Sequence, residues 1–233
     1  MTDSRRVALL RQIDHSELST SATYGDVRRA CLEALHYGFG AVVVHPIHCA
    51  RAAHHLRGTG TSVAAVVGFP TGAFTIEGKA FEARNAIEQG AAEIDYVINV
   101  GALRGGLRDL VLEEMRTLRD VARGHIVKAI LETSVLTDEE KRLACELAVD
   151  AGLDYVETST GFASGGATVE DVRFLHEIVG DAVEVKASGA IPDVQTALAM
   201  IGAGASRFGT NAGVQIAQAL ASMSDDLGRE EAG

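Results

Sequence analysis

Four charged side chains interrupt apolar runs of this sequence, at positions where they could do chemistry. Asp95 lies in EIDYVINV, Lys128 in IVKAILE, Glu157 in LDYVETS and Lys186 in AVEVKAS. A carboxylate can accept a proton, and a lysine can act as a nucleophile or stabilise an anion. Because a charge in an apolar strand is costly to bury alone, we expect these four side chains to converge in one cluster. These four residues are therefore candidates for a functional site.

A purely structural ion network is the alternative explanation of this pattern. Other polar residues near the ends of the same runs are Asn99, Glu132, Thr158 and Glu184. A structural network does not need so many members near one end, so the pattern favours a functional site. His15 and His45 also lie near strand ends and could transfer protons, although a histidine in such a position is more often a hydrogen-bonded structural residue.

Three glycine-rich segments lie towards the C-terminal end of the sequence, each after a different apolar run: TSTGFASGG, ASGAI and FGTNAG. Glycine-rich loops expose backbone N–H groups, which can hold a phosphate together with a helix N-terminus, although tight turns alone also select glycine. We therefore predict a small-molecule substrate that carries a phosphate. The predicted substrate-binding residues are Lys128, Thr160, Gly161, Ser188, Gly189, Gly209, Thr210 and Asn211.

Eight short apolar or alternating runs must position these residues. They cover residues 9–14, 41–46, 62–69, 93–100, 126–132, 153–159, 182–188 and 205–210, with amphipathic helical patterns between them. Repeated strand and helix units predict an α/β fold, either a (β/α)₈ TIM barrel or a doubly wound open sheet. The count of eight favours the barrel, and no G-x-G-x-x-G follows the first run. Polar residues at the carboxyl ends of barrel strands are functional candidates.

One helix is defined at both ends by its sequence. In TDEEKRLACELAVDAG, Thr137 is the expected N-cap, Glu140 its capping-box partner and Gly152 the residue at the helix C-terminus. The whole chain, residues 1–233, is expected to form a single domain. We expect its acidic, glycine-ended tail, residues 222–233, to fray.

Composition excludes several classes of partner. The formal net charge is −11, which argues against binding to nucleic acid or to an anionic membrane. The three cysteines are widely spaced, and no signal peptide or long apolar segment occurs, so we expect a cytoplasmic protein without disulfides. We predict no metal and no cofactor. The expected partners are the substrate and, in a homodimer, a second copy of the chain.

With these residues in view, the sequence resembles the deoxyribose-phosphate aldolase family of class I aldolases. The resemblance covers nearly the whole chain, through IDHSEL, VVGFPTGA, EIDYVINVGAL, VKAILET, ETSTGF, VKASGAI and RFGTNAG. It implies a (β/α)₈ barrel and carbon–carbon bond cleavage through a Schiff base. It also implies proton transfer by Asp95 and a supporting role for Lys186. The lysine that forms the Schiff base in the family would fall at position 157, where this chain has Glu157.

Smaller departures from the family pattern also occur. Val43 and His45 replace a cysteine and an asparagine, and Ala190 replaces the second glycine of a pair. Asn211 and Ala212 occupy positions where the family usually has serines. Phosphate contacts made by backbone N–H groups could survive these changes, whereas contacts made by side-chain hydroxyls could not.

A carboxylate cannot form an imine, so three interpretations remain open. In the first, the chain is an aldolase-like lyase in which Lys186 forms the Schiff base, although a nearby carboxylate favours the unreactive protonated amine. In the second, Glu157 is the general base of an isomerase or epimerase, and protonated Lys186 stabilises the enolate. In the third, the chain is an inactive protein that binds sugar phosphates. The first and second interpretations both require Glu157 and Lys186 to lie in contact.

Overall fold

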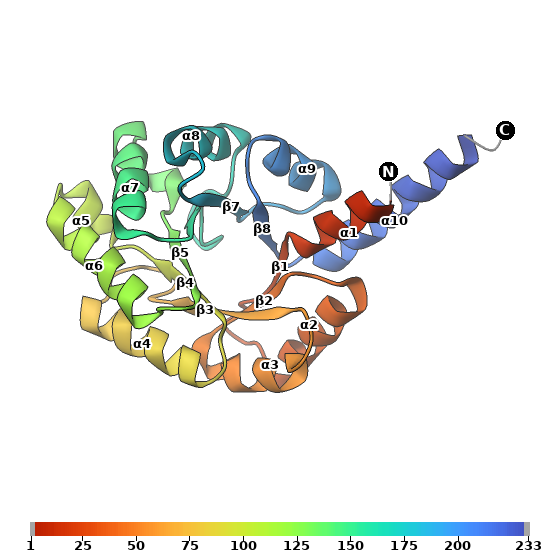
Figure 1. The fold of residues 1–233 in the computed structure, drawn as a ribbon, viewed down its shortest axis with the longest axis horizontal. Coiled ribbons are helices and arrows are strands. Elements are labelled where there is room, and N and C mark those ends of the chain that lie inside the picture. Colours follow the sequence, from red (N-terminus) through yellow and green to blue (C-terminus); the bar gives the residue numbers. More distant parts are fainter. Residues whose placement is uncertain (1–2, 231–233) are drawn as a thin grey trace.

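The computed structural model describes residues 3–230 and forms a closed barrel of eight parallel strands (Figure 1). Each strand pairs with the next along the chain, and β8 pairs with β1. The strands are β1 (Ile13–Glu17), β2 (Ala41–Val44), β3 (Ser62–Val67), β4 (Glu93–Val97), β5 (Ile126–Ile130), β6 (Tyr155–Glu157), β7 (Glu184–Ser188) and β8 (Arg207–Thr210). The prediction of a single-domain (β/α)₈ barrel is confirmed, and the open-sheet alternative is wrong.

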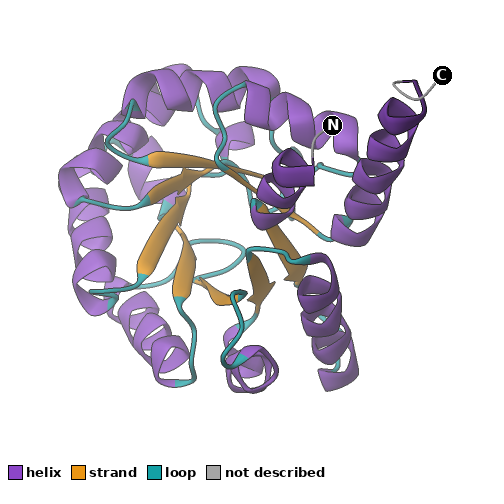
Figure 2. Cartoon of the chain, turned by 45° about the vertical axis from the view of Figure 1, so that its right-hand side comes forward, coloured by secondary structure: helices purple, strands orange, loops and turns teal. Residues whose placement is uncertain are grey.

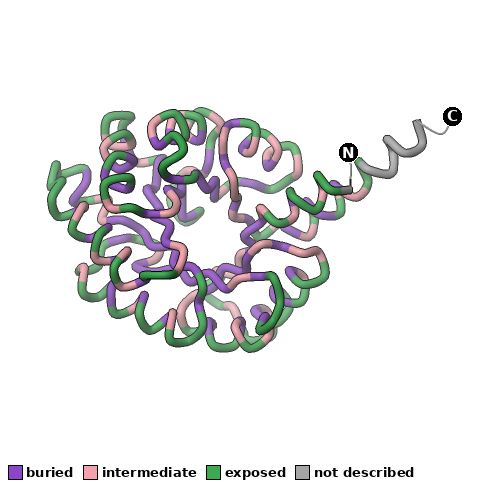
Figure 3. The backbone as a smooth tube through the Cα atoms, in the orientation of Figure 1, coloured by how far each residue is buried: buried purple, intermediate pink, exposed green. Residues whose placement is uncertain are grey.

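Helices surround the barrel, as Figure 2 shows. They are α1 (Asp3–Arg11), α2 (Tyr24–Tyr37), α3 (Cys49–Leu56), α4 (Ile76–Glu88), α5 (Val100–Arg104), α6 (Arg108–Val121), α7 (Asp138–Ala151), α8 (Val169–Val179), α9 (Val194–Gly202) and α10 (Gly213–Glu230). Two short 3₁₀ turns, Pro46–His48 and Thr133–Val135, follow β2 and β5. In Figure 3 the buried backbone forms the central ring and the exposed backbone the outer helical surface. Strands covered on both faces are apolar along most of their length, which explains the continuous runs in the sequence.

The first predicted strand is wrong in its position. The apolar pattern places it at residues 9–14, but α1 continues to Arg11 and β1 begins at Ile13. A short apolar run does not distinguish a strand from a buried helical turn. The true strand, IDHSE, is hard to recognise because its polar residues Asp14 and His15 are themselves buried. The other seven predicted runs overlap the observed strands.

Strand register brings the predicted charged residues together. Asp95 on β4 lies opposite Lys128 on β5, and Glu157 on β6 lies opposite Lys186 on β7. Glu184, at the start of β7, is exposed, so it does not join them. Asn99 accepts a hydrogen bond from the N–H of Ala102 and caps α5. The polar cluster is therefore smaller than the set of polar residues in the runs.

The expected ends of α7 are confirmed. The Thr137 side chain accepts from the N–H of Glu140, whose carboxylate accepts from the N–H of Thr137 at 2.7 Å. Gly152 ends the helix with φ 67°, a conformation that costs glycine little. The fraying expected for residues 222–233 stays a prediction: α10 continues to Glu230, and residues 231–233 lie outside the described part. No helix among residues 3–230 is long and apolar enough to cross a membrane.

Replacing Thr137 by Ala should lower the free energy of unfolding by about 1 kcal/mol, because the N–H of Glu140 at the start of α7 loses the hydroxyl that accepts its hydrogen bond. Chemical denaturation measures this change. Thr137→Ser keeps the hydroxyl and is the matched control, so equal losses in the two variants would contradict a capping role.

Candidate active site

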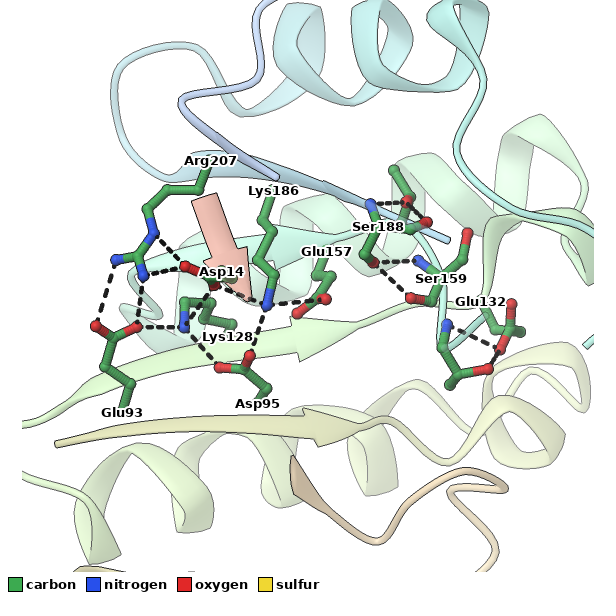
Figure 4. Close-up of polar contacts among 12 residues, drawn as sticks. Asp14, Glu93, Asp95, Lys128, Glu132, Glu157, Ser159, Lys186, Ser188 and Arg207 are labelled. Atoms are coloured by element: carbon green, nitrogen blue, oxygen red, sulfur yellow. Dashed lines mark hydrogen bonds and ion pairs between the residues drawn. The ribbon is translucent and has the colours of Figure 1, made fainter. Parts of the chain in front are cut away.

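The inside of the barrel holds a buried ion network centred on Asp95 (Figure 4). One oxygen of its carboxylate accepts from the Lys128 ammonium at 2.6 Å and the other from the Lys186 ammonium at 2.6 Å. All three side chains are at most 2% exposed. The predicted convergence of Asp95, Lys128 and Lys186 is present in the structure.

Three further members of the network are absent from the residues predicted from the sequence. Asp14 lies 3.0 Å from the Lys186 ammonium and pairs with the guanidinium of Arg207. Glu93 contacts Lys128 at 2.5 Å and Arg207 at 3.3 Å. The spacing of Glu93 and Asp95, two residues apart on one strand, could have indicated a second inward carboxylate. Asp14 and Arg207 meet only because β1 and β8 close the barrel.

Glu157 lies between this network and the open end of the barrel. Its Oε1 atom is 3.1 Å from the Lys186 ammonium, as expected from the sequence. Its Oε2 atom is buried and has no hydrogen-bond partner within the described residues. The side chain also lines the large cavity at the barrel mouth. One carboxylate oxygen is thus held by Lys186, and the other is buried without a partner within the described residues.

The pKa values of Glu157 and Lys186 are both raised, but for different reasons. Burial raises the pKa of Glu157 to about 7, because the attraction of Lys186 only partly offsets the loss of solvation. Burial acts in the opposite direction on Lys186, but Asp14, Asp95 and Glu157 outweigh it and hold its pKa well above the ordinary value. Lys186 is therefore an ammonium, and Glu157 exchanges a proton near neutral pH.

A cavity of about 710 Å³ opens at the carboxyl ends of the strands. Besides Glu157 and Asp95, it is lined by residues from the three glycine-rich loops. The predicted binding residues on its wall are Thr160, Gly161, Ser188, Gly189, Gly209, Thr210 and Asn211. Lys128, also predicted to bind substrate, does not line it, because its ammonium is directed to Glu93 and Asp95. Lys186 likewise lies behind the cavity wall.

The loops on the cavity wall pack closely on one another. A Cβ atom on Gly189 would approach the Cα of Gly161 to 3.2 Å, and Gly189 has φ 77°. Ala190, which follows it, also has a positive φ of 58°, a conformation that costs a non-glycine residue about 1 kcal/mol. The Thr160 hydroxyl donates to Glu132, so Glu132 ties the loop after β6 to the end of β5. The loop backbone, rather than flexible side chains, shapes this wall.

The charge of the cavity wall is mainly negative. Glu17 and Glu33 join Asp95 and Glu157 there, together with His15. Arg29 is the one lysine or arginine of the wall within the described residues, and its guanidinium already contacts Asp26 at 2.8 Å and Glu17 at 3.6 Å. No group of three or more His, Cys, Asp or Glu side chains within residues 3–230 could hold a metal ion.

A closed barrel with buried ionisable groups beneath a cavity at the carboxyl ends of its strands defines an enzyme of the (β/α)₈ class. A family model described as DeoC/LacD family aldolase matches residues 8–219. The chain therefore belongs to this aldolase family and is an aldolase-family lyase.

Individual relatives support this assignment. The deoxyribose-phosphate aldolase of Geobacillus sp. (strain WCH70) is 53% identical over 211 residues, which cover 90% of this chain and 95% of that protein. The deoxyribose-phosphate aldolase of Carboxydothermus hydrogenoformans is 48% identical over 229 residues, covering 97% and 100%. The solved structure of the Aeropyrum pernix deoxyribose phosphate aldolase is 32% identical with a TM-score of 0.87, covering 94% of this chain and 93% of that one.

Replacing Lys186 by Met should lower the free energy of unfolding by about 3 to 5 kcal/mol, because Asp14 and Glu157 lose their shared cation while they remain buried. Chemical denaturation measures the loss. Arg108→Met is the control, since Arg108 pairs with Asp150 on the surface at 3.4 Å and such pairs contribute about 1 kcal/mol at most. Similar losses in the two variants would contradict a stabilising role for the network.

Replacing Glu157 by Gln should change how stability depends on pH. The folded-state pKa of Glu157, about 7, lies above its ordinary value of 4.5, so the folded protein binds this proton more tightly than the unfolded chain. Its contribution to stability is complete below pH 4.5 and is lost as the pH rises through 7. Gln does not titrate, so the variant should gain about 3 kcal/mol relative to the parent between about pH 4.5 and about pH 8. A difference that is constant with pH would contradict the raised pKa.

Proposed function

We propose that this chain is a carbon–carbon lyase of the aldolase type that acts on a small aldehyde or ketose by acid–base catalysis at Glu157, without a Schiff base at that position. The observation that carries the proposal is that Glu157 lines the cavity and that its buried Oε2 atom has no hydrogen-bond partner within the described residues. A group with a pKa of about 7 is suited both to accept and to return a proton at neutral pH.

The proposed reaction is balanced without a co-reactant. Ionised Glu157 accepts the proton of the hydroxyl group on the β-carbon of a β-hydroxy carbonyl substrate. The bond between the α- and β-carbons breaks, its electron pair passes to the α-carbon and the carbonyl group, and the β-carbon becomes a new carbonyl. Protonated Glu157 then gives its proton to the α-carbon of the enolate. The two products are carbonyl compounds, and Glu157 is ionised again.

Lys186 supports this chemistry as a cation. Its ammonium has carboxylate oxygens at 2.6, 3.0 and 3.1 Å, an arrangement that favours the protonated amine and disfavours nucleophilic attack. It also lies behind the cavity wall, so an imine at Lys186 would require the network to rearrange. Held there, Lys186 keeps one oxygen of Glu157 in place and limits how far the pKa of that carboxyl rises.

Two alternatives remain distinguishable. Removal of a proton next to a carbonyl by Glu157, followed by its return elsewhere, would give an isomerase or epimerase. The aldolase relatives favour the lyase, and both reactions share the enolate. An inactive sugar-phosphate-binding protein would hold the same ligand without exchanging its protons.

For the substrate we propose a phosphorylated sugar of the kind named in the relatives, deoxyribose phosphate. The N–H groups of Gly161, Gly189 and Asn211 lie on the cavity wall and have no acceptor within the described residues, which supports a backbone site for the phosphate. Because the imine-forming lysine is replaced, we expect slow cleavage of deoxyribose 5-phosphate.

We also propose a cytoplasmic location, which agrees with three free, buried cysteines. A homodimer stays a proposal as well. The Aeropyrum pernix deoxyribose phosphate aldolase has a tetrameric structure, so larger assemblies occur among the relatives of this chain.

The proposal is tested by the exchange of α-protons of propanal with solvent deuterium, followed by NMR. The protein should catalyse this exchange, with a rate that increases through about pH 7 as Glu157 ionises. Glu157→Gln should lower the rate by about 10²-fold to 10⁴-fold, the usual contribution of a general base. Glu184→Gln, a change at the exposed start of β7, is the matched control.

Borohydride trapping provides the second measurement. No lysine should be trapped with an aldehyde in the parent chain, whereas Glu157→Lys should yield a reducible imine at position 157. Trapping of Lys186 in the parent chain would overturn the proposal in favour of an imine mechanism.

A further inference from the structure

Three residues that line the cavity each have a buried polar atom without a hydrogen-bond partner within the described residues. The atoms are Oε2 of Glu157, Oγ of Ser159 and Nδ1 of His15. A buried polar group that has given up its water without gaining a partner is destabilising. Because all three residues line the same cavity, a ligand bound there is the candidate for the missing partners. Only the first of these atoms has a role in the proposed reaction.

Ser159 follows Glu157 by two residues at the end of β6. Its backbone is fixed from β7: the Ser188 hydroxyl donates to its carbonyl at 2.5 Å and accepts from its N–H at 3.3 Å (Figure 4). Its own hydroxyl makes none of these contacts. The side chain is 1% exposed and cannot turn to bulk solvent. Ser159 is therefore a fixed hydroxyl beside the reacting carboxylate.

His15 lies on β1, across the barrel mouth from β6. Its Nε2 atom is 2.7 Å from the Glu33 carboxylate, and its ring packs against Phe39 with ring centroids 5.2 Å apart. In the neutral imidazole the proton lies on Nε2, where Glu33 accepts it, so Nδ1 presents a lone pair. A Cβ atom on Gly213 would lie 2.7 Å from Nδ1, so only glycine fits beside this ring at the start of α10.

The charges around His15 select the ligand group that it can bind. Glu33 and Glu17 line the same part of the wall, and the nearby Arg29 guanidinium is engaged by carboxylates. An anionic group would be repelled there, whereas a hydroxyl can donate to Nδ1 without a charge. Ser159 can likewise donate to or accept from a hydroxyl.

We propose that Ser159 and His15 bind hydroxyl groups of the substrate on opposite sides of the cavity and make the enzyme selective for polyhydroxylated carbonyl compounds over unsubstituted ones. The selectivity in catalysis rests on the proposed function of Glu157, but the binding of hydroxyl groups does not. Both are positioning residues, since neither transfers the reacting proton.

The test compares deuterium exchange in glyceraldehyde with that in propanal. Ser159→Ala and His15→Phe should each lower the ratio of the two rate constants kcat/KM by about fivefold to tenfold, the equivalent of one hydrogen bond. The loss with glyceraldehyde should exceed any loss with propanal in Ser159→Ala, because propanal has no hydroxyl to lose a partner. Ser206→Ala and His48→Phe change the same residue types away from the cavity and should leave the ratio unchanged.

A binding measurement with an unreactive ligand tests the hydroxyl sites independently of the proposed function of Glu157. Saturation-transfer NMR with erythritol, an unreactive tetraol, should show binding to the parent chain that is weakened by about fivefold or more in Ser159→Ala and His15→Phe. The parent chain could fail to catalyse exchange in propanal while erythritol binding is still weakened in both variants. In that case the proposed function is wrong and the hydroxyl sites are supported. Unchanged ratios and unchanged erythritol binding in Ser159→Ala would overturn the inference, even if His15→Phe does not fold.

Discussion

The sharing of the Asp95 carboxylate between two buried lysines is the interaction on which the interior of this barrel depends. Each carboxylate oxygen holds one ammonium at 2.6 Å. Neither lysine could remain charged at full burial without such partners, and Asp95 alone could not remain ionised. Lys128 and Lys186 are thereby fixed on neighbouring sides of the barrel, and Glu93, Asp14 and Arg207 complete the network beneath them.

The charges of this network do not balance when every group is ionised. Asp14, Glu93, Asp95 and Glu157 are opposed by Lys128, Lys186 and Arg207. One negative charge is therefore in excess. We assign it to Glu157, which has Lys186 as its ion-pair partner and lines the cavity. Burial then favours its neutral form and raises its pKa to about 7. The group most easily protonated is thus the one that a substrate can reach.

Much of this arrangement could be predicted from the sequence, because local signals determine it. Apolar runs located seven strands, Thr137 and Gly152 marked the ends of α7, and the resemblance to the aldolase family placed Glu157 beside Lys186. The pairing of Asp14 with Arg207 could not be predicted in this way, since 193 residues separate them and only closure of the barrel joins them. The depth of Lys128 below the cavity could not be predicted either, because a sequence does not reveal how deep in a barrel an inward residue lies.

The rest of the network explains how position 157 can hold either of two reactive groups. Without residue 157, three carboxylates face three cations, and at Glu157 the effect of burial on the pKa outweighs the attraction of the Lys186 ammonium. Burial favours whichever form of a residue is uncharged. For a lysine, which the resemblance to the family places at this position, this form is the free amine needed for imine formation. For a glutamate it is the carboxylic acid, whose pKa is raised to about 7. We infer that the same network activates a nucleophile when residue 157 is a lysine and an acid–base group when it is a glutamate, which is the basis of the function proposed for this chain.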